Sequence, residues 1–179
     1  TENAAPILID GLSKLEYRGY DSAGIAVSGD ERKNGEIEII KAKGRLQVLR
    51  EMTDNGRTVR GNCGIGHTRW ATHGEPSIVN AHPHFSKDRK IAVVHNGIIE
   101  NYMELKKLLQ DEGYTFQTET DTEVAAAILD YLKKKNLWTN LEVIKEFSNY
   151  VKGSYALGII FDDELDTLYA TREDSPLIV

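Results

Sequence analysis

The sequence is organised around two neighbouring stretches. They read G-I-G-H-T-R-W-A-T-H-G-E-P-S-I-V-N-A-H-P-H (Gly64–His84) and V-V-H-N-G-I-I-E-N (Val93–Asn101), and together they hold all five histidines of the chain. Apolar, strand-like segments at residues 63–70 and 90–95 enclose a polar loop that is rich in His, Gly and Pro. Loops of this kind, held by a rigid scaffold, commonly carry binding and catalytic residues. We therefore expect the functional site in this region.

Alternating apolar residues predict further strands near both ends of the chain, and helical spacing predicts a block of helices between them. The expected strands are residues 22–28, 36–41, 63–70, 90–95, 155–161 and 165–171, with an Asn34-Gly35 turn after the first. The expected helices are residues 4–17, 46–52, 102–112, 121–135 and 141–150. Because the helices follow one another and the strands form hairpins, the pattern favours an α+β fold with antiparallel sheets over a parallel βαβ array.

Two of the expected helices carry capping signals at their first residues. Asn101 precedes Glu104, and Thr120 precedes Glu123, at the spacing of a capping box. We expect each pair to satisfy backbone N–H groups in the first turn of the helix that follows.

The composition is that of an ordinary globular domain. The chain has 179 residues, of which 40% are hydrophobic and 28% are charged, and its formal net charge is -6. Its scattered basic residues argue against a nucleic-acid surface, which needs a basic stripe. No apolar run approaches the ~20 residues that cross a bilayer, and the first residues do not resemble a secretory signal. We expect a cytoplasmic protein with no membrane or nucleic-acid partner.

The cysteine content and the two ends of the chain carry further information. The single cysteine, Cys63, excludes an intrachain disulfide, which fits a reducing compartment. The chain opens on Thr1 instead of Met and closes on the apolar residues Leu177–Val179, a run that a natural terminus seldom leaves exposed. We expect residues 1–179 to form one domain cut from a longer polypeptide.

The five histidines do not have the pattern of a metal site. Zinc sites need three or four ligands at recognisable spacing, and neither H-E-x-x-H nor paired cysteines occur. His67 and His95 are expected to be structural histidines in strands. Cys63 and His67 are well over ~10 Å apart along an extended strand, so they cannot form a nucleophile–base pair. We predict no metal, and a buried, unreactive Cys63.

Several residues have both a chemical and a structural interpretation. Arg69 could grip a carboxylate while Trp70 covers a ligand, or the two could form a surface salt bridge and a packed ring. The Asn96 amide and the Gly97 N–H could form an oxyanion hole or a plain Asn-Gly turn. Asp121 could bind a ligand or only complement the helix dipole. The residues indicate an anion or amino-acid site and leave these alternatives open.

Six strings in the chain resemble the glutaminase domains of the glucosamine-6-phosphate synthases, a family of class II glutamine amidotransferases also called glutamine–fructose-6-phosphate aminotransferases. They are E-Y-R-G-Y-D-S-A-G (Glu16–Gly24), G-H-T-R-W-A-T-H-G-E-P-S (Gly66–Ser77), N-A-H-P-H (Asn80–His84), H-N-G-I-I-E-N (His95–Asn101), E-T-D-T-E (Glu119–Glu123) and G-S-Y-A-L (Gly153–Leu157). They follow the family's order over essentially the whole chain. The resemblance implies an N-terminal nucleophile hydrolase fold, which is a four-layer αββα sandwich of antiparallel sheets, and no cofactor.

The resemblance also implies roles for the ambiguous residues. Arg69 should bind the α-carboxylate of glutamine and Asp121 its α-ammonium group. Trp70 should gate the passage by which ammonia leaves. The Asn96 side chain and the Gly97 N–H should form the oxyanion hole.

Further roles follow for residues near the substrate. Thr72 and His73 should belong to a loop that closes over glutamine, and Arg18 should lie near the terminus of the nucleophile. In the family, that nucleophile is a cysteine that opens the chain as Cys-Gly-Ile. Its own α-amino group, with a pKa near ~7.7–8.0, is a workable base at neutral pH. The sequence given starts at Thr1, so we expect this strand to have been omitted or deleted.

The implied reaction is hydrolysis of glutamine through a cysteinyl thioester, with ammonia passed to fructose 6-phosphate to give glucosamine 6-phosphate. The implied partners are glutamine and a C-terminal sugar isomerase domain of the same polypeptide, which binds fructose 6-phosphate in a homodimeric enzyme. Two alternatives stay open. One is a non-catalytic glutamine-binding module, because the nucleophile is absent from the residues given, and the other is a metal hydrolase that uses the histidines.

Overall fold

The structure is a computed structural model that describes residues 2–29, 36–70 and 75–178. The elements, in chain order, are α1 (Ala4–Leu15), the 3-10 helix η1 (Glu16–Arg18), β1 (Ser22–Ser28), β2 (Glu38–Lys43), α2 (Leu46–Met52), β3 (Cys63–Arg69), β4 (His84–Phe85), β5 (Ile91–Ile99), α3 (Tyr102–Asp111), α4 (Asp121–Lys135), α5 (Asn140–Tyr150), β6 (Gly153–Phe161) and β7 (Tyr169–Glu173).

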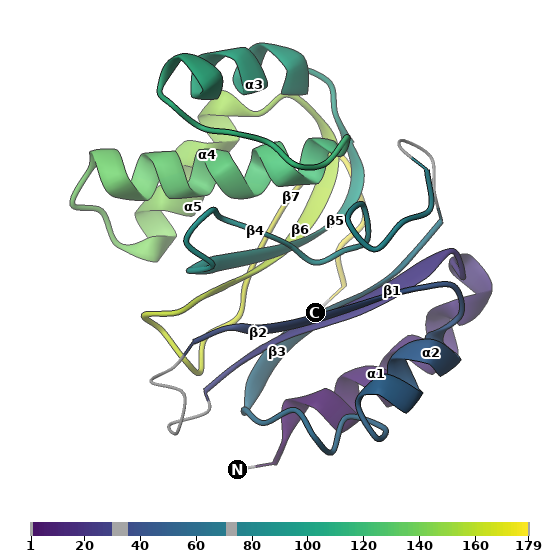
Figure 1. Cartoon of the computed structure of the whole chain (residues 1–179). Helices are drawn as coiled ribbons and strands as arrows, with labels where there is room; N and C mark the ends of the chain where they lie inside the picture. Colours follow the sequence, from purple (N-terminus) through teal and green to yellow (C-terminus); the bar gives the residue numbers. More distant parts are fainter. Residues whose placement is uncertain (1, 30–35, 71–74, 179) are drawn as a thin grey trace.

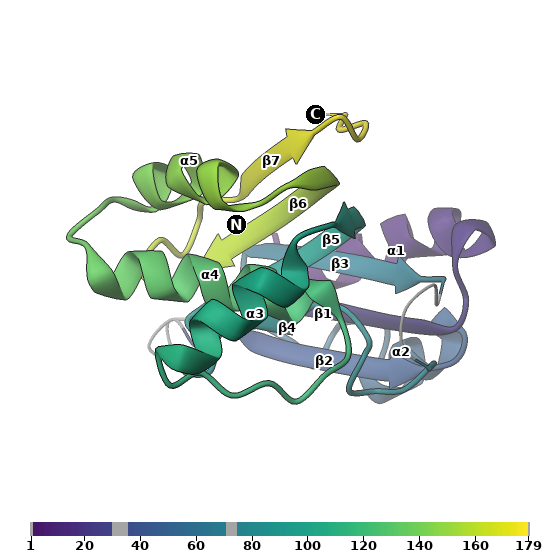
Figure 2. The same cartoon turned by 90° about the horizontal axis from the view of Figure 1, so that it is seen from above.

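Within these residues the strands form two antiparallel sheets, which lie between two layers of helices (Figure 1). The three-stranded sheet has the order β2-β1-β3, and the four-stranded sheet has the order β4-β5-β6-β7. Helices α1 and α2 cover the outer face of the first sheet, and α3, α4 and α5 cover the outer face of the second. Seen from above, β6 runs obliquely to the direction of β2 and β3 (Figure 2). The expected four-layer αββα sandwich is confirmed.

Each interface between layers has its own apolar core. Ile9, Leu12 and Leu49 bring α1 and α2 onto the three-stranded sheet. The core beneath the other helices is larger, because α4 buries ten residues, Thr122 and the nine consecutive residues 124–132. The core between the sheets uses small or slim side chains such as Ala26, Cys63, Ile65, Ala92 and Ile160. Such side chains let the two sheets pack closely face to face.

Most of the expected elements are present, but the paths of several strands differ. β5 does not end at His95: it pairs with β6 as far as Ile99, so the interpretation of Asn96-Gly97 as a turn is wrong. β7 begins at Tyr169 and not at residue 165, because residues 162–168 form the connection from β6. No pattern in the sequence indicated the two-residue strand β4. The Asn34-Gly35 turn lies outside the described residues.

The two capping signals also differ from expectation. The Thr120 side chain does accept from the Glu123 N–H, at 3.3 Å, but the Glu123 carboxylate accepts from Gln117 and Thr118 instead of completing the box. The Asn101 side chain makes no cap hydrogen bond to α3. A complete capping box starts α5, where Thr139 and Glu142 bond each other's backbone N–H.

Asn101 instead ties α3 to the end of α5. Its Nδ2 donates to Tyr150 O at 2.9 Å, and its Oδ1 accepts from Lys152 N at 2.9 Å. Both partners are the backbone groups that lead from α5 into β6, so one side chain holds together two connections far apart in sequence.

Replacing Asn101 by Ala should lower the free energy of unfolding by about 1–2 kcal/mol, because two backbone groups lose their partner. The matched control is Glu104→Gln, which removes the charge of the expected capping partner and should change stability by less than about 0.5 kcal/mol. Urea denaturation of both variants measures the difference. A larger loss in the Glu104 variant would restore the capping interpretation.

Gly97 is required by the backbone of β5. Its φ is +119°, which L side chains rarely adopt, and a Cβ at this position would lie 2.1 Å from Ser154 O on β6. Gly44 also has a positive φ, +91°, but a Cβ there would meet no atom within 4 Å. The two glycines therefore separate backbone strain from steric overlap.

Gly44→Ala should cost about 1–2 kcal/mol of stability from backbone strain alone. Gly97→Ala should cost roughly 1–3 kcal/mol more, because β5 and β6 must move apart to admit the methyl group. Thermal unfolding of the two variants, measured side by side, tests the prediction. Equal losses in the two variants would show that the strand pair tolerates a side chain at Gly97.

Candidate functional site

Arg69 ends β3 at one corner of the three-stranded sheet, and its side chain is buried. Burial lowers the pKa of its guanidinium, although the carboxylates of Asp21 and Asp121 oppose that shift. An arginine remains charged even so. The structure therefore places a buried cation within the electrostatic reach of Asp121, which belongs to the opposite layer.

The segment around Gly19 fixes the backbone that carries Arg69. A Cβ on Gly19 would lie 2.7 Å from the carbonyl carbon of Arg69, and the Asp21 N–H donates to Arg69 O at 3.1 Å. Arg18 precedes this contact, but its exposed side chain donates to the Tyr17 hydroxyl at 2.9 Å. Its expected position near a nucleophile remains a prediction.

Trp70 follows β3 and is 56% exposed, with its ring 5.5 Å from the ring of Tyr20 in an edge-to-face contact. A large exposed ring next to a buried cation suits a residue that meets a ligand, and its expected role at an ammonia passage stays a prediction. Thr72 and His73 lie outside the described residues.

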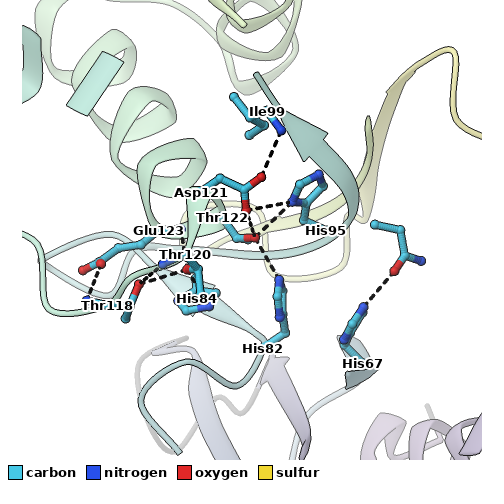
Figure 3. A network of polar contacts seen from close by, with 11 residues as sticks. His67, His82, His84, His95, Ile99, Thr118, Thr120, Asp121, Thr122 and Glu123 are labelled. Atoms are coloured by element: carbon cyan, nitrogen blue, oxygen red, sulfur yellow. Dashed lines mark hydrogen bonds and ion pairs between the residues drawn. The ribbon is translucent and has the colours of Figure 1, made fainter. Parts of the chain in front are cut away.

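Asp121 is the first residue of α4, and its carboxylate binds the backbone of β5 (Figure 3). Oδ2 accepts from the Ile99 N–H at 2.9 Å, and Oδ1 lies 3.6 Å from His95 Nδ1 and 3.3 Å from Thr122 Oγ1. Burial raises the pKa of Asp121, but the bonds to His95, Ile99 and Thr122 outweigh it and hold the pKa below its usual value. Asp121 is therefore an anion at neutral pH, and its carboxylate is held in place by these contacts. An acidic side chain that only complemented the dipole of α4 would not need them.

Asn96 and Gly97 lie on β5, three and two residues before Ile99, respectively. Asn96 is exposed, and its Oδ1 accepts a hydrogen bond from His67 Nε2 on β3 at 2.9 Å. Because Oδ1 is engaged by His67, the Nδ2 group of the amide is the end that can donate to another acceptor. Backbone N–H groups two residues apart in a strand point to the same edge. Because the Ile99 N–H faces Asp121, the Gly97 N–H faces the same edge.

Four histidines pack together behind these residues (Figure 3). The Thr122 hydroxyl lies 2.9 Å from His82 Nε2 and 3.0 Å from His95 Nδ1, and Thr120 Oγ1 lies 3.1 Å from His84 Nε2. The ring of His82 is 4.5 Å from that of His67 and 4.8 Å from that of His84. Three imidazole rings, those of His82, His84 and His95, thus form hydrogen bonds with the hydroxyl groups of Thr120 and Thr122 at the start of α4.

Burial lowers the pKa of His67, and it lowers the pKa of His82 and His84 well below the ordinary value. These rings are neutral at physiological pH and act as packing groups with one N–H each. Within the described parts of the chain, no three His, Cys, Asp or Glu side chains are placed to hold a metal ion. The expectation that His67 is a structural histidine agrees with its bond to Asn96.

Cys63 opens β3 and is buried in the core between the sheets, as expected from its strand pattern. Burial raises the pKa of its thiol, and the hydrogen bond with Ser28 only partly opposes that rise. A thiol of this kind is protonated at neutral pH, so Cys63 has none of the thiolate character that a nucleophile needs.

The sequence did not point to Thr122 or to the backbone of Ile99. In the sequence, Thr122 is only the second residue of a predicted helix, and its three partners come from segments 27 to 40 positions away or from its neighbour Asp121. The pairing of a threonine at the second helical position with His82 and His95 would have required knowledge of how the layers pack.

No described helix is both long enough and apolar enough to span a bilayer.

Comparison with known proteins supports one family. The glutamine amidotransferase domain family matches residues 67–178. Two relatives, both called glutamine–fructose-6-phosphate aminotransferase (isomerizing), are 54% identical over 178 residues and come from Caldanaerobacter subterraneus subsp. tengcongensis and Clostridium acetobutylicum. Each alignment covers 99% of this chain and 28% of the relative, so the chain spans a little over a quarter of their length.

A solved structure has the same fold. The glutamine phosphoribosylpyrophosphate amidotransferase from B. subtilis, complexed with ADP and GMP, aligns with a TM-score of 0.74 and 30% identity. The alignment covers 90% of this chain and 33% of that one. The N-terminal nucleophile hydrolase fold and the resemblance seen in the six strings are both confirmed. The family match over residues 67–178, together with relatives of 54% identity across 99% of this chain, shows that this chain belongs to the glutamine amidotransferase domain family.

Proposed function

We propose that this domain binds glutamine and releases ammonia from its side-chain amide. The observation that supports this most is one fixed cation, Arg69, set against one fixed anion, Asp121, beside Asn96 and Gly97. A free amino acid carries a carboxylate and an ammonium group on one carbon. The guanidinium and the carboxylate match these two charges, which leaves the side-chain amide to face β5.

The chemistry needs a nucleophile and an oxyanion hole. In the proposed reaction, an N-terminal cysteine on a strand before Thr1 attacks the amide carbon of glutamine, and its α-amino group takes the thiol proton. Asn96 Nδ2 and the Gly97 N–H stabilise the oxyanion of the tetrahedral intermediate. The C–N bond then breaks, the nitrogen leaves with the transferred proton as ammonia, and water hydrolyses the thioester to glutamate.

The proposal extends to a longer polypeptide. There, a C-terminal sugar isomerase domain binds fructose 6-phosphate and combines it with the ammonia to give glucosamine 6-phosphate. The names of the relatives, and the small share of their length that this chain spans, support this extension. We further propose a cytoplasmic homodimer that requires no cofactor.

Arg69→Lys in the full-length enzyme should lower kcat/KM for glutamine by about 30-fold or more, which corresponds to ~2 kcal/mol, because an ammonium group cannot reproduce the two-pronged guanidinium contact. Ammonia release at varied glutamine concentration measures it. Binding of fructose 6-phosphate should be unchanged. The matched control is the exposed Arg57, whose change to Lys should have no effect. A loss of less than twofold for Arg69→Lys would exclude it as the carboxylate-binding residue.

Cys63→Ala should leave glutaminase activity within about twofold of the parent, because a buried, protonated thiol contributes no nucleophile. A diazo-ketone analogue of glutamine, followed by peptide mass mapping, identifies the reacting sulfur. Label on the N-terminal cysteine, and none on a chain that begins at Thr1, is the expected result. Label on Cys63 together with activity in the chain from Thr1 would overturn the mechanism. Glutamine binding without label or ammonia in the chain with its N-terminal cysteine would favour a binding-only module.

A further inference from the structure

A cavity lies beside β2, β4 and the start of α4, and its lining does not include the residues proposed to bind glutamine. It has a volume of about 370 Å³, which is near the lower end for small-molecule sites. β2, the loops on both sides of β4, the segment before α4 and the first turns of α4 line it. Its apolar wall includes Ile39, Ile78, Val79, Phe85 and Phe116. None of Arg69, Asn96, Gly97 and Asp121 lines this cavity.

Lys41 of β2 contributes the central charge of the cavity wall. Its Nζ donates to Val79 O at 3.1 Å and lies 5.7 Å from the centre of the Phe85 ring. An ammonium group has three donors, and in the described part of the chain this hydrogen bond accounts for one of them. No described carboxylate forms an ion pair with it. A half-buried cation beside open space therefore retains donors for an acceptor that enters the cavity.

Burial lowers the pKa of Lys41 to about 8. The groups around the ammonium therefore do not fully offset the cost of burying its positive charge. Glu123 of α4 opposes this shift, and Arg69 of β3 adds to it. The Glu123 carboxylate is already engaged, since it accepts from the backbone N–H groups of Gln117 and Thr118. His84 also faces Lys41, and burial keeps its ring neutral by lowering its pKa well below the ordinary value.

Two more cations line the same cavity. The Arg89 guanidinium lies 5.0 Å from the Phe85 ring centre, and Lys87 belongs to the same loop. Three cations thus face one carboxylate in a chain whose net charge is -6. The cavity combines positive charge with aromatic and aliphatic walls. These features suit a ligand that has an acidic group joined to a flat apolar body.

We propose that this cavity is a second ligand site, which binds a compact aromatic anion with its acidic group on Lys41 and its ring against the walls formed by Phe85, Phe116 and Ile78. The proposal stands on the cavity and its charges and does not depend on glutamine hydrolysis. The arrangement requires both parts of the ligand, because the cations supply attraction for the acid and the rings supply apolar contact area.

The test uses phenyl phosphate as the probe, inorganic phosphate as an acid without a ring, and benzyl alcohol as a ring without an acid. Titration of the intact protein by calorimetry, with NMR shifts of the lining residues, should show phenyl phosphate binding at least tenfold more tightly than either part. Equal affinity for phosphate and phenyl phosphate, or shifts only near Arg69, would overturn the proposal.

Variants of Lys41 make the assignment specific. Lys41→Met should weaken phenyl phosphate binding at least tenfold, whereas Lys43→Met, two residues along β2 and outside the cavity lining, should leave it unchanged. Asp121→Asn should also leave it unchanged, which separates this site from the proposed glutamine site. Unchanged binding in Lys41→Met would refute the role of Lys41.

The pH dependence gives a readout that does not rely on removing the side chain. Because the anion binds the protonated amine, affinity should be constant near pH 7 and should fall as the pH rises through about 8. Lys41→Arg, which stays charged, should keep the binding and lose this fall. An unchanged fall in Lys41→Arg would show that another group titrates and would overturn the proposal.

Discussion

The carboxylate of Asp121 joins three parts of the molecule: the first turn of α4, the backbone of β5 and the candidate site. One oxygen accepts from the Ile99 N–H, and the other lies beside His95 and Thr122. Its side chain is still 20% exposed, so the same charge that fixes α4 on β5 can also meet a ligand. A ligand-binding anion that is also a structural contact is held rigidly, and such support keeps a site in its productive geometry.

The opposite charge comes from the other sheet. Arg69 ends β3, and its distance from Asp121 is set by how closely the two sheets pack. Small side chains such as Ala26, Cys63 and Ala92 fill that interface. A larger residue there would force the sheets apart and would change the separation of the two charges. The core between the sheets thereby sets the separation of the cation and the anion on which the proposed glutamine site depends.

Sequence patterns predicted the layers well, because apolar periodicity reports which face of each element is buried. They failed where the outcome depends on partners distant in the chain. Asn96-Gly97 has the composition of a turn, yet pairing with Ala156 and Tyr155 keeps it in β5. Asn101 has the position of a cap, yet it bonds the end of α5. Lys41 has the appearance of a solvated strand residue, and only the fold places it at a cavity.

The histidines show why residue type alone did not decide the chemistry. A neutral imidazole has one N–H, and the bond to Asn96 Oδ1 assigns that proton of His67 to Nε2. A second proton would place a charge next to the rings of His82 and His95 and near Arg69, and burial lowers the pKa against it. The neutral ring therefore orients the Asn96 amide with its N–H groups directed away from His67. Among the described residues, His67, His82 and His84 form a packed, uncharged support, in which His67 sets the direction of the donor on which the proposed oxyanion hole depends.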